Sequence, residues 1–294
     1  MRLPQALPKP FTIGIRPLDH AEWIDADGLL GDYLSEKARL WDTERDAVFA
    51  AEPGTEAAQA ELLAMLAAHL PARFPELYRR DGEAIEVAGR RVRLDGDEPP
   101  LAIAASLVQE DLVLMRRGES HWRLAAASLS FPSAWRLADK FGRPMHEVHG
   151  PVPGFAEGTR NAQLIQRMFD NLRPEGGMIR WNWSLFGDGR LFHPDSHATG
   201  PRFGEGAASA WFRLERQTFR KLPVSGDVVF TIRIYLDPLA SLARLPEGPA
   251  LAATLSEQLA ALTDEQADYK GLLAERAALQ ARLAGLMVPQ GIGV

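Results

Sequence analysis

Five strand-like segments, divided into a pair and a trio by a helical stretch, constrain the fold of this chain more than any other feature. They are residues 111–116, 121–130, 178–186, 211–220 and 228–236. Gly118–Ser120 joins the first two as a hairpin turn, and the last three are rich in aromatic and alternating apolar residues. This order predicts an α+β fold with a five-stranded antiparallel sheet and a helical block on one face. It excludes a doubly wound α/β fold, in which strands and helices alternate.

Helical patterns fill most of the remaining chain. Leucines at helical spacing predict helices within residues 21–80, with one helix starting after Thr55 and ending at Pro71. A helix is expected from Ser133, acting as its cap, through Phe141. Further helices are expected over the ranges 156–172 and 249–287, and a hairpin over 85–94. Residues 101–107 fit a buried helix or a strand equally well.

Two strands, a helical block and three strands also follow one another in a PAS-type domain, where the helices and the sheet enclose a ligand. We therefore expect three parts. Residues 1–20 form an extended N-terminal segment, residues 21–245 form a single PAS-like domain with additional N-terminal helices, and residues 246–294 form a C-terminal helical extension.

Composition excludes several classes of function. The chain has no cysteine, which rules out disulfides, zinc ribbons, catalytic thiols, cysteine-bound iron–sulfur clusters and a thiolate ligand to haem. The net charge of −6 argues against a nucleic-acid partner. No apolar run approaches the roughly 20 residues of a membrane span, and the N-terminus lacks the apolar core of a signal peptide. We therefore expect a cytoplasmic protein without a membrane partner.

A proline-bounded turn carries two histidines, His146 and His149. Pro144 can open a short helical turn because its missing N–H is not needed there, and Gly150 and Pro151 end it. A histidine held at the rigid end of such a turn is suited to bind a metal or a haem iron. His149 is the first candidate, the alternative being that it bonds a carbonyl and ends the turn. His146 shares its face, so a two-histidine site is open, but a structural or exposed role is expected.

Polar residues on the last three strands form a second group of candidates. Asn182 lies between Trp181 and Trp183, so it should face the side of the sheet opposite to both. The two tryptophans either pack in the core or wall an apolar cofactor pocket. Arg216 and Arg233 are expected in the core, where a charge requires an anionic partner. A carboxylate substrate, a haem propionate and a buried aspartate are the partners open to them.

Seven ordered segments add a family-level signal. They are residues 107–115, 130–135, 140–144, 149–154, 180–184, 213–218 and 230–235. Together they resemble the haem-dependent oxidative N-demethylase family, over most of the chain. The resemblance implies a PAS-like fold that binds haem b through an axial histidine, carried over to His149 from its place before Gly150–Gly154. It also implies that a small secondary amine, such as dimethylamine, is oxidatively demethylated with O2.

The resemblance places the substrate side of the haem on the sheet. Candidates by polarity and strand position are Asn182, Glu215, Arg216, Thr231, Arg233 and Tyr235. A carboxylate such as Glu215 would hold the ammonium group, and an arginine such as Arg216 would stabilise charge on oxygen. Arg216 and Arg233, with Trp183 and Thr231, are also expected to contact the haem. Electrons are expected from a separate NADPH-dependent reductase with a flavin and an iron–sulfur centre, because the chain has neither cysteines nor a dinucleotide motif.

Two other classes of function are open on the sequence. The protein could be a haem-containing PAS gas sensor or carrier without turnover, or a haem-free module that binds a small molecule. A sensor usually joins to an output module, for which this chain has room only in its added helices. The colour of the purified protein separates the haem-free class from the others, and amine-dependent NADPH consumption separates the enzyme from the sensor.

Overall fold

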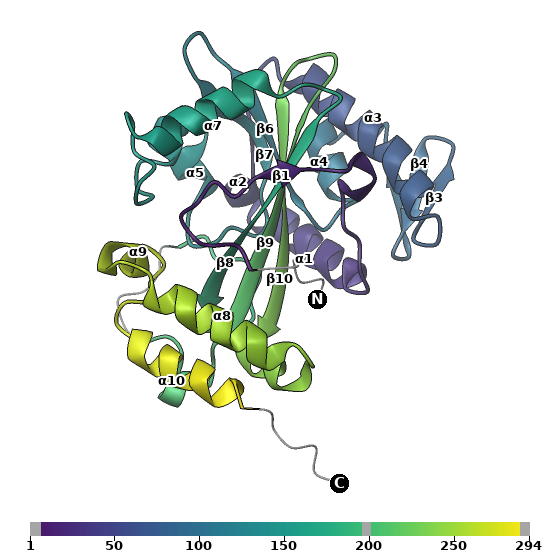
Figure 1. The fold of residues 1–294 in the computed structure, drawn as a ribbon. Helices are drawn as coiled ribbons and strands as arrows, with labels where there is room; N and C mark the ends of the chain where they lie inside the picture. The colour runs from purple at the N-terminus through teal and green to yellow at the C-terminus, as the bar shows by residue number, and fades with distance from the viewer. Residues whose placement is uncertain (1–6, 196–200, 289–294) are drawn as a thin grey trace.

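A seven-stranded antiparallel sheet forms the centre of the computed structural model, which describes residues 7–195 and 201–288 (Figure 1). Its order is β1-β8-β9-β10-β6-β7-β2. The strands are β1 (Arg16–Pro17), β2 (Phe49–Ala51), β6 (Asp111–Arg117), β7 (Trp122–Ser128), β8 (Gly177–Phe186), β9 (Trp211–Lys221) and β10 (Val228–Pro238). The five predicted strands are all present as neighbours, but the predicted number of strands is wrong. The edge strands β1 and β2 are only two and three residues long, too short for alternation to reveal them.

A separate three-stranded sheet consists of β3 (Tyr78–Asp81), β4 (Ala84–Val87) and β5 (Arg90–Arg93). The hairpin predicted over residues 85–94 is confirmed as β4 and β5. Ala88 and Gly89 join them with φ of 48° and 73°, the left-handed conformations that a two-residue hairpin turn requires. Strand β3 corrects the prediction that helix extends to residue 80.

The helices mostly match the predicted ranges. They are α1 (Leu30–Thr43), α2 (Arg45–Val48), α3 (Glu56–Arg73), α4 (Pro100–Ala105), α5 (Leu137–Lys140), α6 (Met145–Val148), α7 (Arg160–Asn171), α8 (Gly248–Ala260), α9 (Asp264–Tyr269) and α10 (Arg276–Leu286). Pro71 lies inside α3 and does not end it. The helix predicted from Ser133 is wrong at its start, because only α5 is helical and the Ser133 hydroxyl bonds Glu215 instead of capping. Among the described residues, no helix is long and apolar enough to cross a bilayer.

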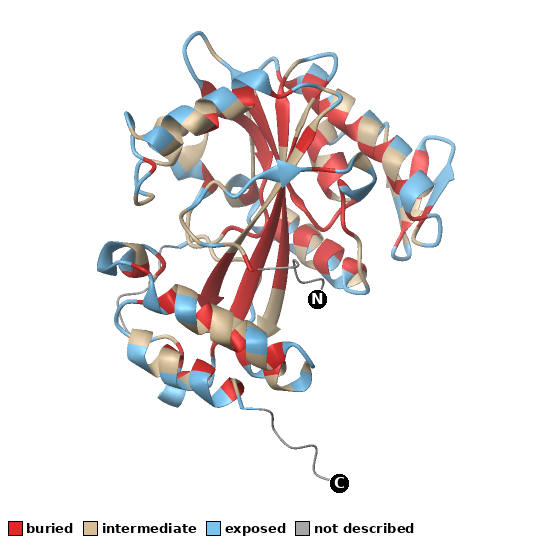
Figure 2. Cartoon of the chain, viewed as in Figure 1, coloured by how far each residue is buried: buried red, intermediate tan, exposed pale blue. Residues whose placement is uncertain are grey.

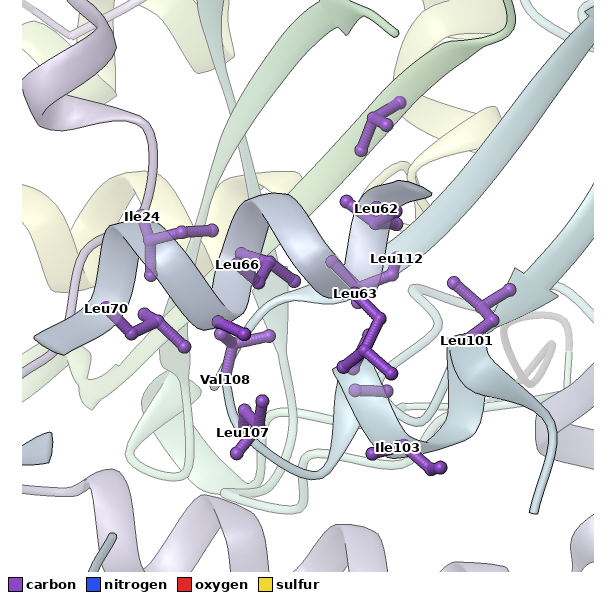
Figure 3. Close-up of a cluster of buried hydrophobic side chains, with 14 of the residues drawn as sticks. Ile24, Leu62, Leu63, Leu66, Leu70, Leu101, Ile103, Leu107, Val108 and Leu112 are labelled. Carbon is purple, nitrogen blue, oxygen red and sulfur yellow. The ribbon is translucent and has the colours of Figure 1, made fainter. Parts of the chain in front are cut away.

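Both faces of the sheet are covered, which makes its central strands the most buried part of the molecule (Figure 2). On one face, Val113 and Met115 of β6 pack with Phe169 of α7. On the other face, Leu112 and Leu114 join the core formed with α3 and α4. Figure 3 shows the α3 leucines pointing toward the residues of α4 and β6 in this core. The predicted helical block therefore lies on one face, where parts of α1 and α2 join it, while α3, α4 and the C-terminal helices cover the other.

The far end of that second face is covered by the C-terminal helices (Figure 1). Leu255 of α8 and Leu283 of α10 share a core with Leu214 of β9. The C-terminal extension is thus packed on the same sheet as the N-terminal helices. The residues predicted to be extended at 1–6 and helical or terminal at 289–294 lie outside the described residues.

His69 of α3 makes the stability of the folded protein depend on pH. His69 packs edge-on against Trp23, with ring centroids 5.6 Å apart, and its Nε2 atom is buried without a hydrogen-bond partner. Burial, reinforced by the charges of Arg220 and Arg73, lowers its pKa from 6.5 to about 4. The unfolded chain therefore binds more protons than the folded chain between these two values. Stability that is present above pH 6.5 should be lost as the pH falls toward 4.

We expect the substitution His69→Gln, which removes this titration, to make the decline in stability from pH 7 to 4.5 smaller than in the unsubstituted protein. Urea unfolding at several pH values measures the difference. Buried Glu110 and Asp111, whose pKa values are raised by burial, act with the opposite sign. They are common to both proteins, so their contribution cancels in the comparison. Parallel pH profiles for the two proteins would contradict the prediction.

Candidate active site

An apolar cavity of about 280 Å³ lies between the sheet and the helical block α5–α7. Its walls include Met115, Leu124, Phe131, Ile165, Phe219 and Ile232. Tyr269 and Lys270, which end α9, also line it, so the C-terminal extension helps to enclose the cavity. Against these apolar walls stand a few polar side chains from β8, β9 and the segment before α5. That combination is typical of a binding site for a small molecule or cofactor.

His149 lies in the wall of this cavity, at the end of the short helix α6. Pro144 is the N-cap of that helix, and the His149 N–H closes it by donating to the carbonyl of Met145 at 3.0 Å. The predicted proline-bounded turn is thus confirmed. Burial, with the nearby charges of Lys140 and Arg180, lowers the pKa of His149 from 6.5 to about 4. These effects outweigh a backbone hydrogen bond between the carbonyl of Met145 and the imidazole, which by itself would raise the pKa of His149. The imidazole is therefore neutral near pH 7, the form that binds metals.

His146 occupies a different place from His149. It lines a neighbouring cavity of about 360 Å³, and its ring lies 4.6 Å from that of His121. Its Nδ1 atom is buried without a partner. His149 lines both cavities, so of the two histidines only His149 reaches the cavity that contains Glu215.

A bare metal ion would lack a ligand cage here. Within the part of the chain that the structure describes, no three His, Asp or Glu side chains are grouped so as to hold an ion. A protein site for zinc supplies three or four ligands, whereas a haem iron needs only one axial side chain because the porphyrin supplies four nitrogens. A single neutral imidazole in an apolar cavity therefore fits a macrocycle-bound iron better than a free ion.

Glu215 of β9 brings a carboxylate into the same cavity. Ser133 Oγ donates to its Oε1 at 2.5 Å, and Gln217 Nε2 and Asn182 Nδ2 donate to its Oε2 at 2.7 and 3.3 Å. Asn182 of β8 is the register partner of Glu215, which is why the two side chains meet. Neutral donors thus hold the carboxylate in one orientation within the cavity.

Arg213 fixes the serine that holds Glu215. Its guanidinium is fully buried and donates to Ser133 Oγ at 3.0 Å and to the carbonyls of Phe131, Pro132 and Leu191 at 2.7–3.3 Å. Because Ser133 Oγ accepts this bond, its own hydrogen is directed to Glu215. Sequence analysis missed this role for Ser133, since a serine after Phe131–Pro132 is also a typical helix cap.

Three cations line the cavity beside Glu215: Lys140, Arg180 and Lys270. Burial lowers the pKa of Lys140 and of Lys270 to about 8, against a partial opposing effect of Glu215. Sequence analysis also missed these residues. Arg180 could have been found, because it lies two residues from Asn182 on the same strand and must share its face. Lys140 and Lys270 come from short helices whose position no local pattern predicts.

The remaining predicted residues face the opposite side of the sheet. They are Trp183, Arg216, Thr231, Arg233 and Tyr235. In the register of β9 and β10, Arg216 lies opposite Arg233, one step along from the pair of Glu215 and Ile234. Successive residues of a strand point to opposite faces, so Arg216 and Glu215 cannot line one cavity. The structure therefore brings His149, Asn182 and Glu215 together and separates the other five from them.

Those five residues bond to other parts of the protein. Arg233 Nη2 donates to Asp27 Oδ2 at 2.8 Å, while Arg216 Nη1 donates to the carbonyl of Trp23 at 3.1 Å. Arg233 therefore has an anionic partner within the fold, and that partner is the carboxylate of Asp27. The other contacts are Tyr235 to Asp25, Thr231 to Thr218 at 2.6 Å, and Trp183 to Gln258 at 2.6 Å.

The cavity chemistry matches what a haem presents: apolar faces, a metal that accepts one imidazole, and carboxylates that need cations. A comparison with known protein families also points to a haem protein. The family model described as "haem-dependent oxidative N-demethylase, alpha subunit-like" matches residues 14–280. The match spans the sheet, the helical block and most of the C-terminal helices, and it confirms the family to which the sequence segments pointed. The chain belongs to the haem-dependent oxidative N-demethylase alpha subunit-like family.

Proposed function

We propose that this protein binds haem b in the cavity through His149 and oxidatively demethylates a small secondary amine such as dimethylamine. The observation that carries the proposal is that the imidazole of His149 and the carboxylate of Glu215 line one apolar cavity. When bound, haem supplies the iron at which O2 is used to oxidise the N-methyl group. The overall reaction is dimethylamine, O2, two electrons and two protons giving methylamine, formaldehyde and water.

The residues of the cavity divide the remaining work. Glu215 holds the protonated amine, because a carboxylate among apolar walls is the strongest local attraction for a small cation. Ser133, Asn182 and Gln217 keep that carboxylate in place through neutral donors, and within the described part of the chain none of its oxygens forms a direct ion pair. The apolar walls accommodate the methyl groups and limit water. The protonated amine is thereby held in the same cavity as the imidazole of His149.

The wider organisation follows from this assignment. We propose a PAS-like domain over residues 21–245 with a C-terminal helical extension, located in the cytoplasm. Electrons come from a separate NADPH-dependent reductase with a flavin and an iron–sulfur centre, because the chain has no cysteine to ligate such a centre. In this proposal Trp183, Arg216, Thr231, Arg233 and Tyr235 stabilise the opposite face of the sheet and do not contact haem or substrate.

An absorption spectrum tests the cofactor, and a coupled assay tests the reaction. The purified protein should show a haem absorption band that shifts when dithionite and CO are added. With a competent reductase, dimethylamine should stimulate NADPH and O2 consumption and yield formaldehyde, while the chain alone should show no NADPH-driven turnover. Haem that reduces and binds CO but never turns over a secondary amine would favour a sensor or carrier. A colourless protein that takes up no added haem would contradict the proposal.

A further inference from the structure

The charges that line the active-site cavity do not balance. Lys140, Arg180 and Lys270 contribute three positive charges, and Glu215 is the single carboxylate among the described lining residues. A half-buried, largely apolar cavity with two surplus positive charges is costly unless anions occupy it. The surplus therefore points to a bound group that carries two negative charges.

The contacts of each cation show which ones need a partner. Lys270 is buried and donates to the carbonyl of Trp183 at 2.7 Å, so its ammonium is already engaged by the protein. Lys140 lies over the ring of Trp135 at 3.9 Å, and within the described part of the chain its ammonium has neither a hydrogen bond nor an ion pair. Arg180 makes one long bond, 3.3 Å to the carbonyl of Thr12, and its Nε atom is buried without a partner.

Lys140 and Arg180 also have the right position relative to the proposed axial ligand. Both line the cavity that His149 also lines. Lys140 lines the outer groove next to the cavity as well as the cavity itself, so it stands at the entrance. Arg180 projects from β8, two residues before Asn182, on the sheet side of the cavity. Together they offer two cationic positions around one imidazole.

We propose that Lys140 and Arg180 bind the two carboxylates of the haem, an inference that rests on the haem binding proposed above. Lys140 and Arg180 thus take the role that sequence analysis gave to Arg216 and Arg233. Those two arginines bond within the protein on the opposite face of the sheet. Arg180 can form two parallel hydrogen bonds to a carboxylate, whereas Lys140 provides a point charge at the entrance. Lys270 is left beside Glu215 as part of the protein's own network.

The test compares haem with its dimethyl ester, in which both carboxylates are blocked. The apoprotein, the variants Lys140→Met and Arg180→Met, and the control Arg160→Met are titrated with each porphyrin, and haem release to an apo-globin acceptor is timed. Arg160 is an exposed residue at the start of α7 that lines neither the cavity nor the outer groove. The unsubstituted protein and the control should bind haem about tenfold or more tightly than the ester. Each variant should lose affinity for haem by about tenfold while its affinity for the ester stays unchanged.

Other outcomes separate this inference from its alternatives. Variants that weaken both porphyrins equally would show only a packing role and would overturn the inference, as would variants that discriminate as well as the unsubstituted protein. The latter result would assign the two cations to an anionic substrate. Lys140→Arg, which keeps the charge, should retain most of the preference for haem, and circular dichroism checks that each variant is folded. Failure of the unsubstituted protein to bind either porphyrin would overturn the haem proposal itself.

Discussion

Replacing His149 by alanine should abolish haem binding. His149 presents a neutral imidazole in the cavity, and it is the only histidine among the described residues that line this cavity. Changes to the outer-shell partners of a metal ligand reduce metal affinity by roughly 10–100-fold, so loss of the ligand itself should exceed about 100-fold. The measurement is the haem absorption band of the purified variant and its titration with haem. Added imidazole should restore a band, because it can occupy the space that the side chain leaves.

His146→Ala is the matched control for this prediction. His146 lies on the same short helix but lines the neighbouring cavity with His121. It should retain the haem band and the haem affinity of the unsubstituted protein. A His149→Ala variant with a normal band, together with a His146→Ala variant without one, would reverse the assignment of the ligand.

The local features of the fold were predictable because each depends on neighbouring residues. The proline-bounded turn at His149 depends on Pro144 and Gly150, and the five long strands depend on their own alternation. The pairing of Asn182 with Glu215 was not predictable in the same way. It depends on the register between β8 and β9, which is set by packing of the whole sheet.

The face of each strand residue was the main feature that the sequence left undetermined. Strand β9 is buried on both faces, so its pattern does not alternate between apolar and polar residues in the usual way. Glu215 and Arg216 are consecutive and nearly equally buried, at 6% and 5% exposed, yet they face different cores. Polarity alone therefore grouped residues that the alternation of the strand separates. Lys140 and Lys270 reach the cavity through tertiary packing of short helices, for which no spacing rule exists.

Replacing Glu215 by glutamine should strongly impair turnover while leaving haem binding intact. The substitution keeps the shape of the side chain but removes the charge that holds the protonated amine. It also places an amide against the donors Asn182 and Gln217, which the carboxylate accepts at 3.3 and 2.7 Å. Loss of one such electrostatic contact at a reacting centre typically costs about 100- to 1,000-fold in rate. We expect a decrease of that size in kcat/KM for dimethylamine, measured as formaldehyde production with the reductase present.

The matched control for Glu215→Gln is Glu147→Gln, because Glu147 is an exposed carboxylate on α6 outside the cavity. It should leave kcat/KM unchanged. The haem band, the haem affinity and the thermal unfolding temperature of Glu215→Gln should all stay close to those of the unsubstituted protein, which distinguishes loss of substrate binding from loss of structure. A Glu215→Gln variant that retains normal turnover would show that another group holds the amine. A variant that also loses haem would instead place Glu215 in the support of the cofactor site.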